Sequence, residues 1–346
     1  MKQTRKKMEP TRAKGRDSLG GILSGQKRIR VMDGTYFGRE RIKVLIGPSS
    51  FGEQDPLPLN LLKEKGFEIV NNPYKRKLTK DEVIKLLSEN VAGLIAGLEP
   101  LDREVLSKTA LRVISRCGSG MSNVDLKAAA EKGIKVYSTP QGPVTAVAEL
   151  TVGALLNLLR RISFMDNQLH AGKWNKQIGC QLEGKTVAII GFGRIGKKLA
   201  ALIKAFGAKL IAVDPNSKGE IDGVKIVSLE QALREADIIS LHAAGEEEII
   251  GSREIKLMKK GVFILNAARG SLLNEPALAD ALESKKVAGA WLDAFGVEPY
   301  QGPLTKYSQV VLTPHVGSYT IECRKAMEME AAENLLLGFK EAGIYE

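Results

Sequence analysis

The sequence predicts an α/β protein built from two doubly wound, parallel-sheet domains. From residue 42 onward, short apolar runs rich in β-branched residues alternate with segments of helical periodicity. The runs are apolar throughout, which is typical of strands buried on both faces of a parallel sheet. The length of 346 residues, 44% of them hydrophobic, is sufficient for about two such domains.

The first domain is expected to begin at residue 42 with five strands and four helices. The strands are predicted at residues 43–47, 67–70, 91–97, 111–115 and 134–137, and the helices at 57–65, 79–89, 102–109 and 124–132. Thr79 and Glu82 form the pattern of a capping box at the start of the second helix. Residues 139–143 have the Pro and Gly content of a turn and mark a boundary.

The second domain is expected over residues 143–316. A long helix is predicted at 144–170, and strands at 186–191, 209–214, 238–242, 262–267, 289–293 and 310–313, with helices between them that include 275–284. Residues 320–343 are predicted to form a helix that returns to pack on the first domain. The first domain is then discontinuous and comprises residues 42–142 and 317–346.

Residues 1–41 are expected to form a disordered basic tail. Residues 1–43 carry thirteen basic and four acidic side chains, so they supply +9 of the net charge of +11. The segment has no periodic apolar face to offset its ordering entropy. Because the rest of the chain carries only +2, the overall charge is not a sign of nucleic-acid binding. A targeting or anion-binding arm is the alternative interpretation of the tail.

Composition also bears on location. No apolar run approaches the roughly 20 residues of a membrane helix, and no secretory h-region follows the basic start. Cys117, Cys180 and Cys323 lie far apart without the spacing of metal ligands, so no metal site is expected. We therefore expect reduced thiols in a cytoplasmic protein that does not contact a membrane.

One motif predicts a dinucleotide site in the second domain. An apolar run ends in Gly191-Phe-Gly193-Arg-Ile-Gly196, a helical pattern follows, and Asp214 ends the next apolar run 18 residues later. Gly191 permits the tight turn, Gly193 lets a pyrophosphate approach, and Gly196 lets the helix pack closely on the strand. Asp214 is expected to bond the ribose hydroxyls and to repel a 2′-phosphate, so the cofactor is predicted to be NAD.

Three histidines are candidates for a proton shuttle. His170, at the polar end of the long helix, is predicted to lie on the surface. His242 ends strand 238–242 without an evident charged partner, which favours a structural or peripheral role. His315 ends the last strand at the edge where ligands bind, although its position alone fits a buried core histidine equally well.

Two charged segments favour His315. Arg269 lies just past strand 262–267, and arginine binds carboxylates through two parallel hydrogen bonds. Asp293 and Glu298 follow the next strand, and a carboxylate on the Nδ1 atom of a histidine fixes its tautomer and favours its protonated form. Each charge alone is typical of a surface ion pair; together they predict a site for a carbonyl substrate with a carboxylate.

Taken in order, six motifs resemble the D-isomer-specific 2-hydroxyacid dehydrogenases, and within them the phosphoglycerate dehydrogenase-like proteins. The resemblance covers residues 43–320. The motifs are Arg116-Cys-Gly118-Ser119-Gly120-Met-Ser-Asn123-Val-Asp125, Val147-Ala-Glu149, Gly191-Phe-Gly-Arg-Ile-Gly196, Asn266-Ala-Ala-Arg269-Gly270, Asp293 through Glu298-Pro299, and Thr313-Pro-His315-Val-Gly317.

The resemblance implies a role for each matching residue. Arg269 would bind the substrate carboxylate and carbonyl, His315 would act as acid/base, and Glu298 would be its partner. The residues implied to contact the cofactor are Gly191, Gly193, Arg194, Ile195, Gly196, Asp214, Ala267 and Asp293, the last through the nicotinamide amide. The residues implied to hold the substrate are Arg116, Ser119, Gly120 and Arg269, with Ser119 and Gly120 using their backbone.

The resemblance also implies a flavodoxin-like substrate domain, a Rossmann NAD domain, a cleft between them, and a homodimer formed through the NAD domains. Arg116 matches a phosphate-binding arginine of some phosphoglycerate dehydrogenases, which favours 3-phosphoglycerate. A second such arginine is absent at Gly97-Leu98-Glu99, so glyoxylate, hydroxypyruvate or another D-2-hydroxyacid is the alternative. An NAD-sensing transcriptional corepressor on the same fold is the alternative of another class. The family's H-x-P-L-T pattern is replaced after His242 by Ala-Ala-Gly245 and three glutamates.

Overall fold

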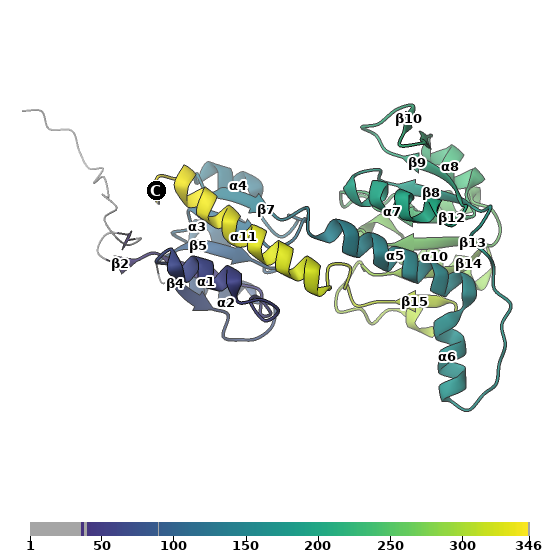
Figure 1. The fold of residues 1–346 in the computed structure, drawn as a ribbon, viewed down its shortest axis with the longest axis horizontal. Helices are drawn as coiled ribbons and strands as arrows, with labels where there is room; N and C mark the ends of the chain where they lie inside the picture. Colours follow the sequence, from purple (N-terminus) through teal and green to yellow (C-terminus); the bar gives the residue numbers. More distant parts are fainter. Residues whose placement is uncertain (1–35, 38–39, 89, 345–346) are drawn as a thin grey trace, which may run out of the picture.

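The computed structural model describes residues 36–37, 40–88 and 90–344. Most of the predicted tail, residues 1–35, lies outside this range. Within the tail, β1 (Tyr36–Phe37) and β2 (Glu40–Arg41) form a short antiparallel pair. The rest of the described chain forms two lobes side by side, each with its own sheet (Figure 1).

The first sheet has five parallel strands in the order β4-β3-β5-β6-β7, which is the flavodoxin-like order. The strands are β3 (Lys43–Ile46), β4 (Glu68–Asn71), β5 (Val91–Ala96), β6 (Val113–Arg116) and β7 (Lys135–Ser138). The helices are α1 (Leu57–Glu64), α2 (Lys80–Leu87), α3 (Arg103–Ser107) and α4 (Leu126–Glu131). Every element predicted here is present, and the capping box is confirmed because Thr79 and Glu82 each accept a backbone N–H from the other.

The last helix completes this lobe. α11 (Ile321–Glu341) lies along the first sheet, as Figure 1 shows in yellow over purple and blue. Phe339 is fully buried and its ring stacks on that of Phe67 at 5.1 Å. A Cβ atom on Gly93 would lie 2.6 Å from the Phe339 ring, so this strand position has no room for a side chain. The predicted return of the C-terminal helix to the first domain is confirmed.

The second sheet has eight strands in the order β10-β11-β9-β8-β12-β13-β14-β15. They are β8 (Thr186–Ile190), β9 (Lys209–Val213), β10 (Glu220–Ile221), β11 (Val224–Ile226), β12 (Ile238–Leu241), β13 (Val262–Asn266), β14 (Val287–Leu292) and β15 (Val310–Leu312). The helices that connect them are α7 (Arg194–Lys204), α8 (Leu229–Glu235), α9 (Ser252–Leu257) and α10 (Glu275–Glu283). The order from β11 to β14 is the dinucleotide-binding order, and it reverses beside β8.

The predicted set of six strands in this sheet was incomplete. The chain turns at Asp222 and Gly223, which have φ angles of 54° and 76°, and so forms the β10–β11 hairpin. Asp-Gly is a strong signal for such a turn. The hairpin was missed because its strands are only two and three residues long.

The single long helix predicted at 144–170 is also corrected. The structure has two helices, α5 (Pro143–Arg160) and α6 (Ile162–His170), separated by Arg161 in the left-handed conformation with φ of 53°. Asn157 closes the corner because its side chain hydrogen bonds both the backbone N–H and the Oγ of Ser163 at 2.8 and 2.7 Å. The break turns α6 away from the body of the lobe (Figure 1).

α5 is long and apolar enough to cross a membrane by length and composition alone, but half of it is buried inside the structure. Several of its buried side chains, including Leu155 and Leu159, belong to the same core cluster as Leu199 of α7 and Trp291 of β14. The apolar character of α5 is therefore accounted for mainly by the core of the second lobe.

Candidate active site

The glycine-rich turn after β8 has the geometry of a dinucleotide site. Gly191 has a φ of 95°, and a Cβ atom there would lie 2.4 Å from the backbone nitrogen of Ala243. A Cβ atom on Gly196 would lie 2.3 Å from the carbonyl oxygen of Gly191, so α7 packs directly against the turn. Two of the three motif glycines are thus required by close backbone approach.

The third glycine faces open space. A Cβ atom on Gly193 would meet no atom within 4 Å. α7 begins at Arg194, and the N–H groups of its first turn, including those of Arg194 and Ile195, have no acceptor within the helix. Room beside the turn and free N–H groups at a helix N-terminus fit a pyrophosphate.

Asp214 lies at the mouth of this turn. Its Oδ2 accepts a hydrogen bond from the backbone N–H of Phe192 at 2.9 Å, and its Oδ1 accepts one from Asn216 at the same distance. The carboxylate is therefore held beside the glycine-rich turn, where the adenosine ribose of a dinucleotide lies in this motif.

Replacing Asp214 with alanine is expected to narrow the preference for NADH over NADPH by about tenfold or more, because it removes a negative charge beside the position of the 2′-phosphate. The measurement is kcat/KM for both cofactors with one 2-oxoacid. Glu220→Ala removes an exposed acid from the neighbouring hairpin and is the control. Equal use of both cofactors by the wild-type protein would contradict the assignment of Asp214.

His315 and Glu298 form a pair at the end of β15. The Nδ1 atom of His315 lies 2.9 Å from Oε2 and 3.0 Å from Oε1 of Glu298. Both side chains are partly exposed, at 41% and 35%. Because Glu298 occupies Nδ1, the free nitrogen of the ring is Nε2, which is the atom available to a substrate.

Asp293 holds the turn that carries this histidine. His315 adopts the left-handed conformation, with φ of 53°, which is costly for a residue with a side chain. The buried Asp293 carboxylate accepts hydrogen bonds from Thr313 Oγ1 at 2.6 Å, Val316 N at 2.9 Å and Gly317 N at 2.8 Å. Asp293 therefore positions His315; its implied bond to the nicotinamide amide stays a prediction.

Arg269 follows β13 in a turn that its neighbours fix. The buried side chain of Asn266 donates to the carbonyl oxygen of Arg269 at 2.8 Å and accepts from Ala268 N at 3.1 Å. A Cβ atom on Gly270 would lie 1.8 Å from the backbone of Phe295, so the turn lies directly on the segment after β14. Asn266 had no predicted role, although it lies in the predicted Asn266–Gly270 motif.

The opposite wall of the site comes from the first lobe. A Cβ atom on Gly120 would lie 2.0 Å from an Nη atom of Arg269, so the 118–120 loop and Arg269 are in contact across the two lobes. Thr139 is buried and fixes this loop, since its Oγ1 accepts from Gly118 N at 2.6 Å. The predicted substrate loop, with Ser119 and Gly120, is thus brought against the predicted substrate arginine.

Arg116 ends β6 beneath the same loop. Its guanidinium donates to the carbonyl oxygen of Cys117, and its Nε has no hydrogen-bond partner among the described residues. Burial lowers the pKa of Arg116, and the positive charges of Arg269 and Arg324 also lower it. Arg324, the third arginine of this group, was not predicted because it lies on α11, far along the chain.

The segment after His242, where three glutamates follow Ala-Ala-Gly245, places the carboxylate of Glu246 in the site. Glu246 Oε1 lies 3.8 Å from Arg269 Nε, and Glu246 Oε2 accepts a hydrogen bond from Ser271 at 2.9 Å. Glu248 accepts one from Asn274 at 2.9 Å. The loop is therefore tied to the Arg269 segment, and Glu246 is within ion-pair distance of the predicted substrate arginine.

The other two histidines lie apart from this pair. His170 is exposed, as predicted, and lies 3.4 Å from Asp166. His242 hydrogen bonds Ser240 at 2.7 Å, and burial lowers its pKa to about 4. A histidine that stays neutral is a poor proton donor, which favours His315 as the acid/base.

Together these features define a class of protein. A dinucleotide turn, an arginine, and a histidine–glutamate pair all lie at the carboxyl ends of the strands of one sheet, facing a loop from the other lobe. This arrangement is typical of an oxidoreductase that uses a nicotinamide cofactor on a carbonyl or alcohol substrate with an anionic group.

Comparison with known proteins identifies the family. Residues 152–317 match the model described as "D-isomer specific 2-hydroxyacid dehydrogenase, NAD binding domain". A hydroxypyruvate reductase from Thermotoga maritima is 39% identical over 278 residues, which are 77% of this chain and 90% of that protein. The chain belongs to the D-isomer-specific 2-hydroxyacid dehydrogenase family, and its cofactor is NAD.

Other relatives are named for different activities. A D-3-phosphoglycerate dehydrogenase from Methanocaldococcus jannaschii is 38% identical over 75% of this chain, but the match spans only 51% of that protein. Among solved structures, the TT0316 protein from Thermus thermophilus has a TM-score of 0.80 at 33% identity, covering 87% of this chain and 97% of that one. A glyoxylate reductase from Paecilomyes thermophila has a TM-score of 0.77 at 30% identity, covering 85% and 94%.

Proposed function

We propose that this protein transfers hydride between NAD and a small D-2-hydroxyacid/2-oxoacid pair, with Arg269, Glu298 and His315 at its catalytic centre. The observation that supports this most is the His315–Glu298 contact of 2.9 Å, at the same edge of the sheet as a turn with room for a pyrophosphate. The domains proposed are residues 42–142 and 317–346 for substrate and 143–316 for NAD. The free cysteines support a cytoplasmic location.

The chain's own residues would bind the substrate and move a proton. Arg269 and the backbone N–H groups of Ser119 and Gly120 would hold the 2-oxoacid carboxylate, and Arg269 would also face the carbonyl oxygen. His315 would donate the proton on Nε2 to that oxygen as it gains negative charge, while Glu298 stabilises the imidazolium. NAD in its reduced form supplies the hydride when it is bound.

Two substrate classes are candidates. Arg116 supports 3-phosphoglycerate, the first choice from the sequence, because a buried arginine can hold a phosphate. The Arg116 guanidinium already donates a hydrogen bond to the carbonyl oxygen of Cys117. Because this donor is occupied, the contact supports the second candidate, hydroxypyruvate or glyoxylate. The relatives are divided in the same way: the phosphoglycerate dehydrogenase from M. jannaschii is matched over about half its length, whereas the hydroxypyruvate reductase from T. maritima is matched over 90%.

A substrate panel tests the proposal. The purified protein is expected to oxidise NADH in the presence of at least one of hydroxypyruvate, glyoxylate, pyruvate and 3-phosphohydroxypyruvate, with the initial rate followed at 340 nm. Turnover of none of these acids would contradict the proposed function. The order of kcat/KM among them identifies the substrate class.

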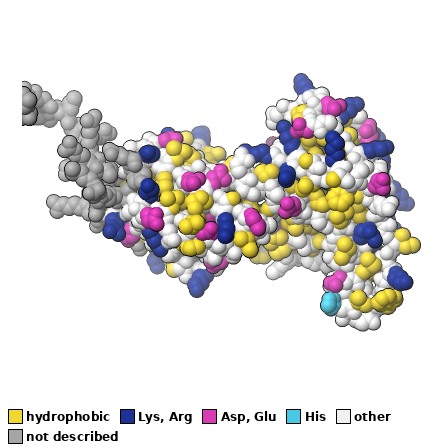
Figure 2. All heavy atoms as spheres, viewed as in Figure 1, with side chains coloured by type: hydrophobic (Ala, Val, Ile, Leu, Met, Phe, Trp, Pro, Cys, Tyr) yellow, Lys and Arg dark blue, Asp and Glu magenta, His cyan; other side chains and the backbone are white. Residues whose placement is uncertain are grey.

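We further propose that two copies associate through their NAD domains, where α6 projects from the second lobe. None of the residues of α6 is buried, and Figure 2 shows hydrophobic side chains on this projection. Leu169, Trp174 and Ile178, in and just after α6, are 57%, 79% and 100% exposed. Such a set of apolar side chains is typical of a surface covered by another chain.

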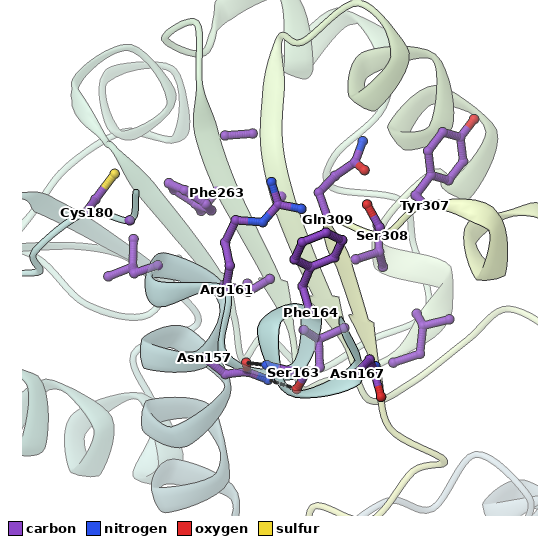
Figure 3. Close-up of a pocket in the computed structure, with 18 of the residues that line it drawn as sticks. Asn157, Arg161, Ser163, Phe164, Asn167, Cys180, Phe263, Tyr307, Ser308 and Gln309 are labelled. Carbon is purple, nitrogen blue, oxygen red and sulfur yellow. Dashed lines mark hydrogen bonds between the residues drawn. The ribbon is translucent and has the colours of Figure 1, made fainter. Parts of the chain in front are cut away.

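A cavity of ≈ 630 Å³ beside α6 supports the same surface (Figure 3). Arg161 and Phe164 point into it, with the guanidinium 4.5 Å from the ring centroid. Its other wall includes Gln309 and strand β15, which is the free edge of the second sheet. A second copy of the chain would cover both the cavity and the exposed apolar residues.

Replacing Ile178 with aspartate is therefore expected to convert a dimer into a monomer at micromolar concentration. The wild-type protein should show twice the chain mass of 37.6 kDa in sedimentation or light-scattering experiments. Burial of an isoleucine is worth about 1.5–3 kcal/mol, and a buried charge would reverse that gain. Leu126→Asp, on the exposed face of α4, is the matched control. A monomeric wild-type protein would contradict the proposal.

A further inference from the structure

Glu99 is a buried carboxyl group beside the substrate loop. It lies just past β5 and is only 1% exposed. β3 and β5 are neighbours in the first sheet. The strand that follows β3 along the chain, β4, lies beside β3, and the strand that follows β5, β6, lies beside β5, so the strand order runs in opposite directions from this pair. In open parallel sheets, the crevice outside the carboxyl ends of two such strands is where ligands bind. Glu99 occupies this crevice in the first lobe.

Two glycines leave the space that the carboxyl group fills. A Cβ atom on Gly47, just past β3, would lie 2.2 Å from Glu99 Oε1, and one on Gly97 would lie 2.9 Å from Oε2. The backbone N–H of Gly97 donates to both carboxyl oxygens, at 2.9 and 3.0 Å. The Glu99 carboxyl group therefore fills the space and accepts the Gly97 N–H. Both could otherwise be used to bind an anionic group of a ligand.

The segment around Glu99 is fixed to the substrate loop. Asn123 donates to the carbonyl oxygens of Glu99 and Gly97 at 2.7 and 3.2 Å. Asn123 lies three residues past Gly120, whose backbone contacts Arg269. Arg116 is paired with Ala96 in the adjacent strands, so it ends β6 beside Glu99. The filled crevice is thus next to the proposed position of the substrate.

The charged groups around the crevice are partly engaged with one another. Burial raises the pKa of Glu99, while the Gly97 N–H and the positive charge of Arg116 act in the opposite direction. Arg324 is engaged elsewhere, since it donates to buried Glu328 at 2.6 Å and to Ser50 at 3.0 Å. The space and the N–H group are taken whether Glu99 is charged or neutral.

We propose that Glu99 is a specificity-determining residue that fills the far end of the substrate site and so selects small, unphosphorylated 2-oxoacids over 3-phosphorylated ones. This proposal rests on the proposed function. A phosphate on C3 of the substrate would need an N–H donor and space at the end of the site, and Glu99 already occupies both. A hydrogen or hydroxyl at C3 needs neither.

The test compares hydroxypyruvate with 3-phosphohydroxypyruvate, using NADH and steady-state kinetics. The wild-type kcat/KM is expected to favour hydroxypyruvate by about tenfold or more. Glu99→Ala and Glu99→Ser open the crevice and should lower that ratio about tenfold, mainly through a smaller KM for the phosphorylated acid. Glu99→Gln keeps the volume and an acceptor for Gly97 N–H and should change the ratio less than about threefold. Glu53→Gln, an exposed glutamate in the loop after β3, should not change it.

Inorganic phosphate gives a second readout. In the two opened variants it should inhibit hydroxypyruvate reduction competitively at concentrations about tenfold lower than in the wild-type protein. Thermal unfolding and NADH binding show which variants are folded, and Glu99→Ser serves if Glu99→Ala is not. A wild-type preference for the phosphorylated acid, or an unchanged ratio in a folded opened variant, would overturn the proposal. Turnover of neither acid, nor of any other in the panel, would overturn the proposed function itself.

Discussion

Replacement of His315 by glutamine is expected to lower kcat by at least 10²-fold with the preferred 2-oxoacid. Glutamine is similar in size but cannot give up a proton to the forming alkoxide, and general acid catalysis is typically worth about 10²–10⁴-fold. The measurement is steady-state kcat near the pH optimum, together with an NADH titration by fluorescence. Binding of NADH should be retained because His315 lies on the turn after β15, away from the glycine-rich turn after β8.

Two further variants sharpen this prediction. His170→Gln alters an exposed histidine on α6 and should leave kcat unchanged. His242→Gln should not reproduce the loss, since burial keeps the pKa of His242 near 4 and the ring neutral. Near-native turnover by His315→Gln would assign the acid/base role to His242 or to water, and the site as described would then be wrong.

Glu298→Gln is the companion change, and it is expected to lower kcat at the pH optimum less than His315→Gln does. The carboxylate lies 2.9 Å from His315 Nδ1 and holds the ring with Nε2 free for the substrate. Glutamine keeps the size of the side chain but loses the negative charge, so it should hold the ring less firmly. Steady-state kcat near the pH optimum should therefore fall, but less than in His315→Gln. A loss as large as that of His315→Gln, or no loss, would contradict a positioning role for Glu298.

The strands were predicted well because buried parallel strands read as continuous apolar runs. β5 (Val91–Ala96) and β8 (Thr186–Ile190) are examples, with core residues at nearly every position. The break at Arg161 was not predictable in the same way. Apolar residues continue on both sides of it, and the corner depends on the contact between Asn157 and Ser163.

The candidate site was predictable in part, for a related physical reason. Arg269, Asp293 and His315 each follow a strand of one parallel sheet, and the carboxyl ends of such strands meet at one edge. The supporting contacts depend on tertiary structure instead. Arg324 reaches the first lobe from α11, and Glu99 is explained only by the glycines around its carboxyl group. No spacing along the chain brings those segments together.

Replacement of Arg269 by lysine is expected to lower kcat/KM by about 10²-fold, through both a higher KM and a lower kcat. Lysine keeps the charge but loses the planar pair of donors that can hold a carboxylate and face the carbonyl oxygen together. Steady-state kinetics with the preferred acid measure both parameters. Arg234→Lys, which changes an exposed arginine of α8 that pairs with Glu230, is the matched control and should behave as wild type. Near-native KM and kcat in Arg269→Lys would show that this arginine carries charge alone, and the substrate would then have to be oriented by the backbone of Ser119 and Gly120.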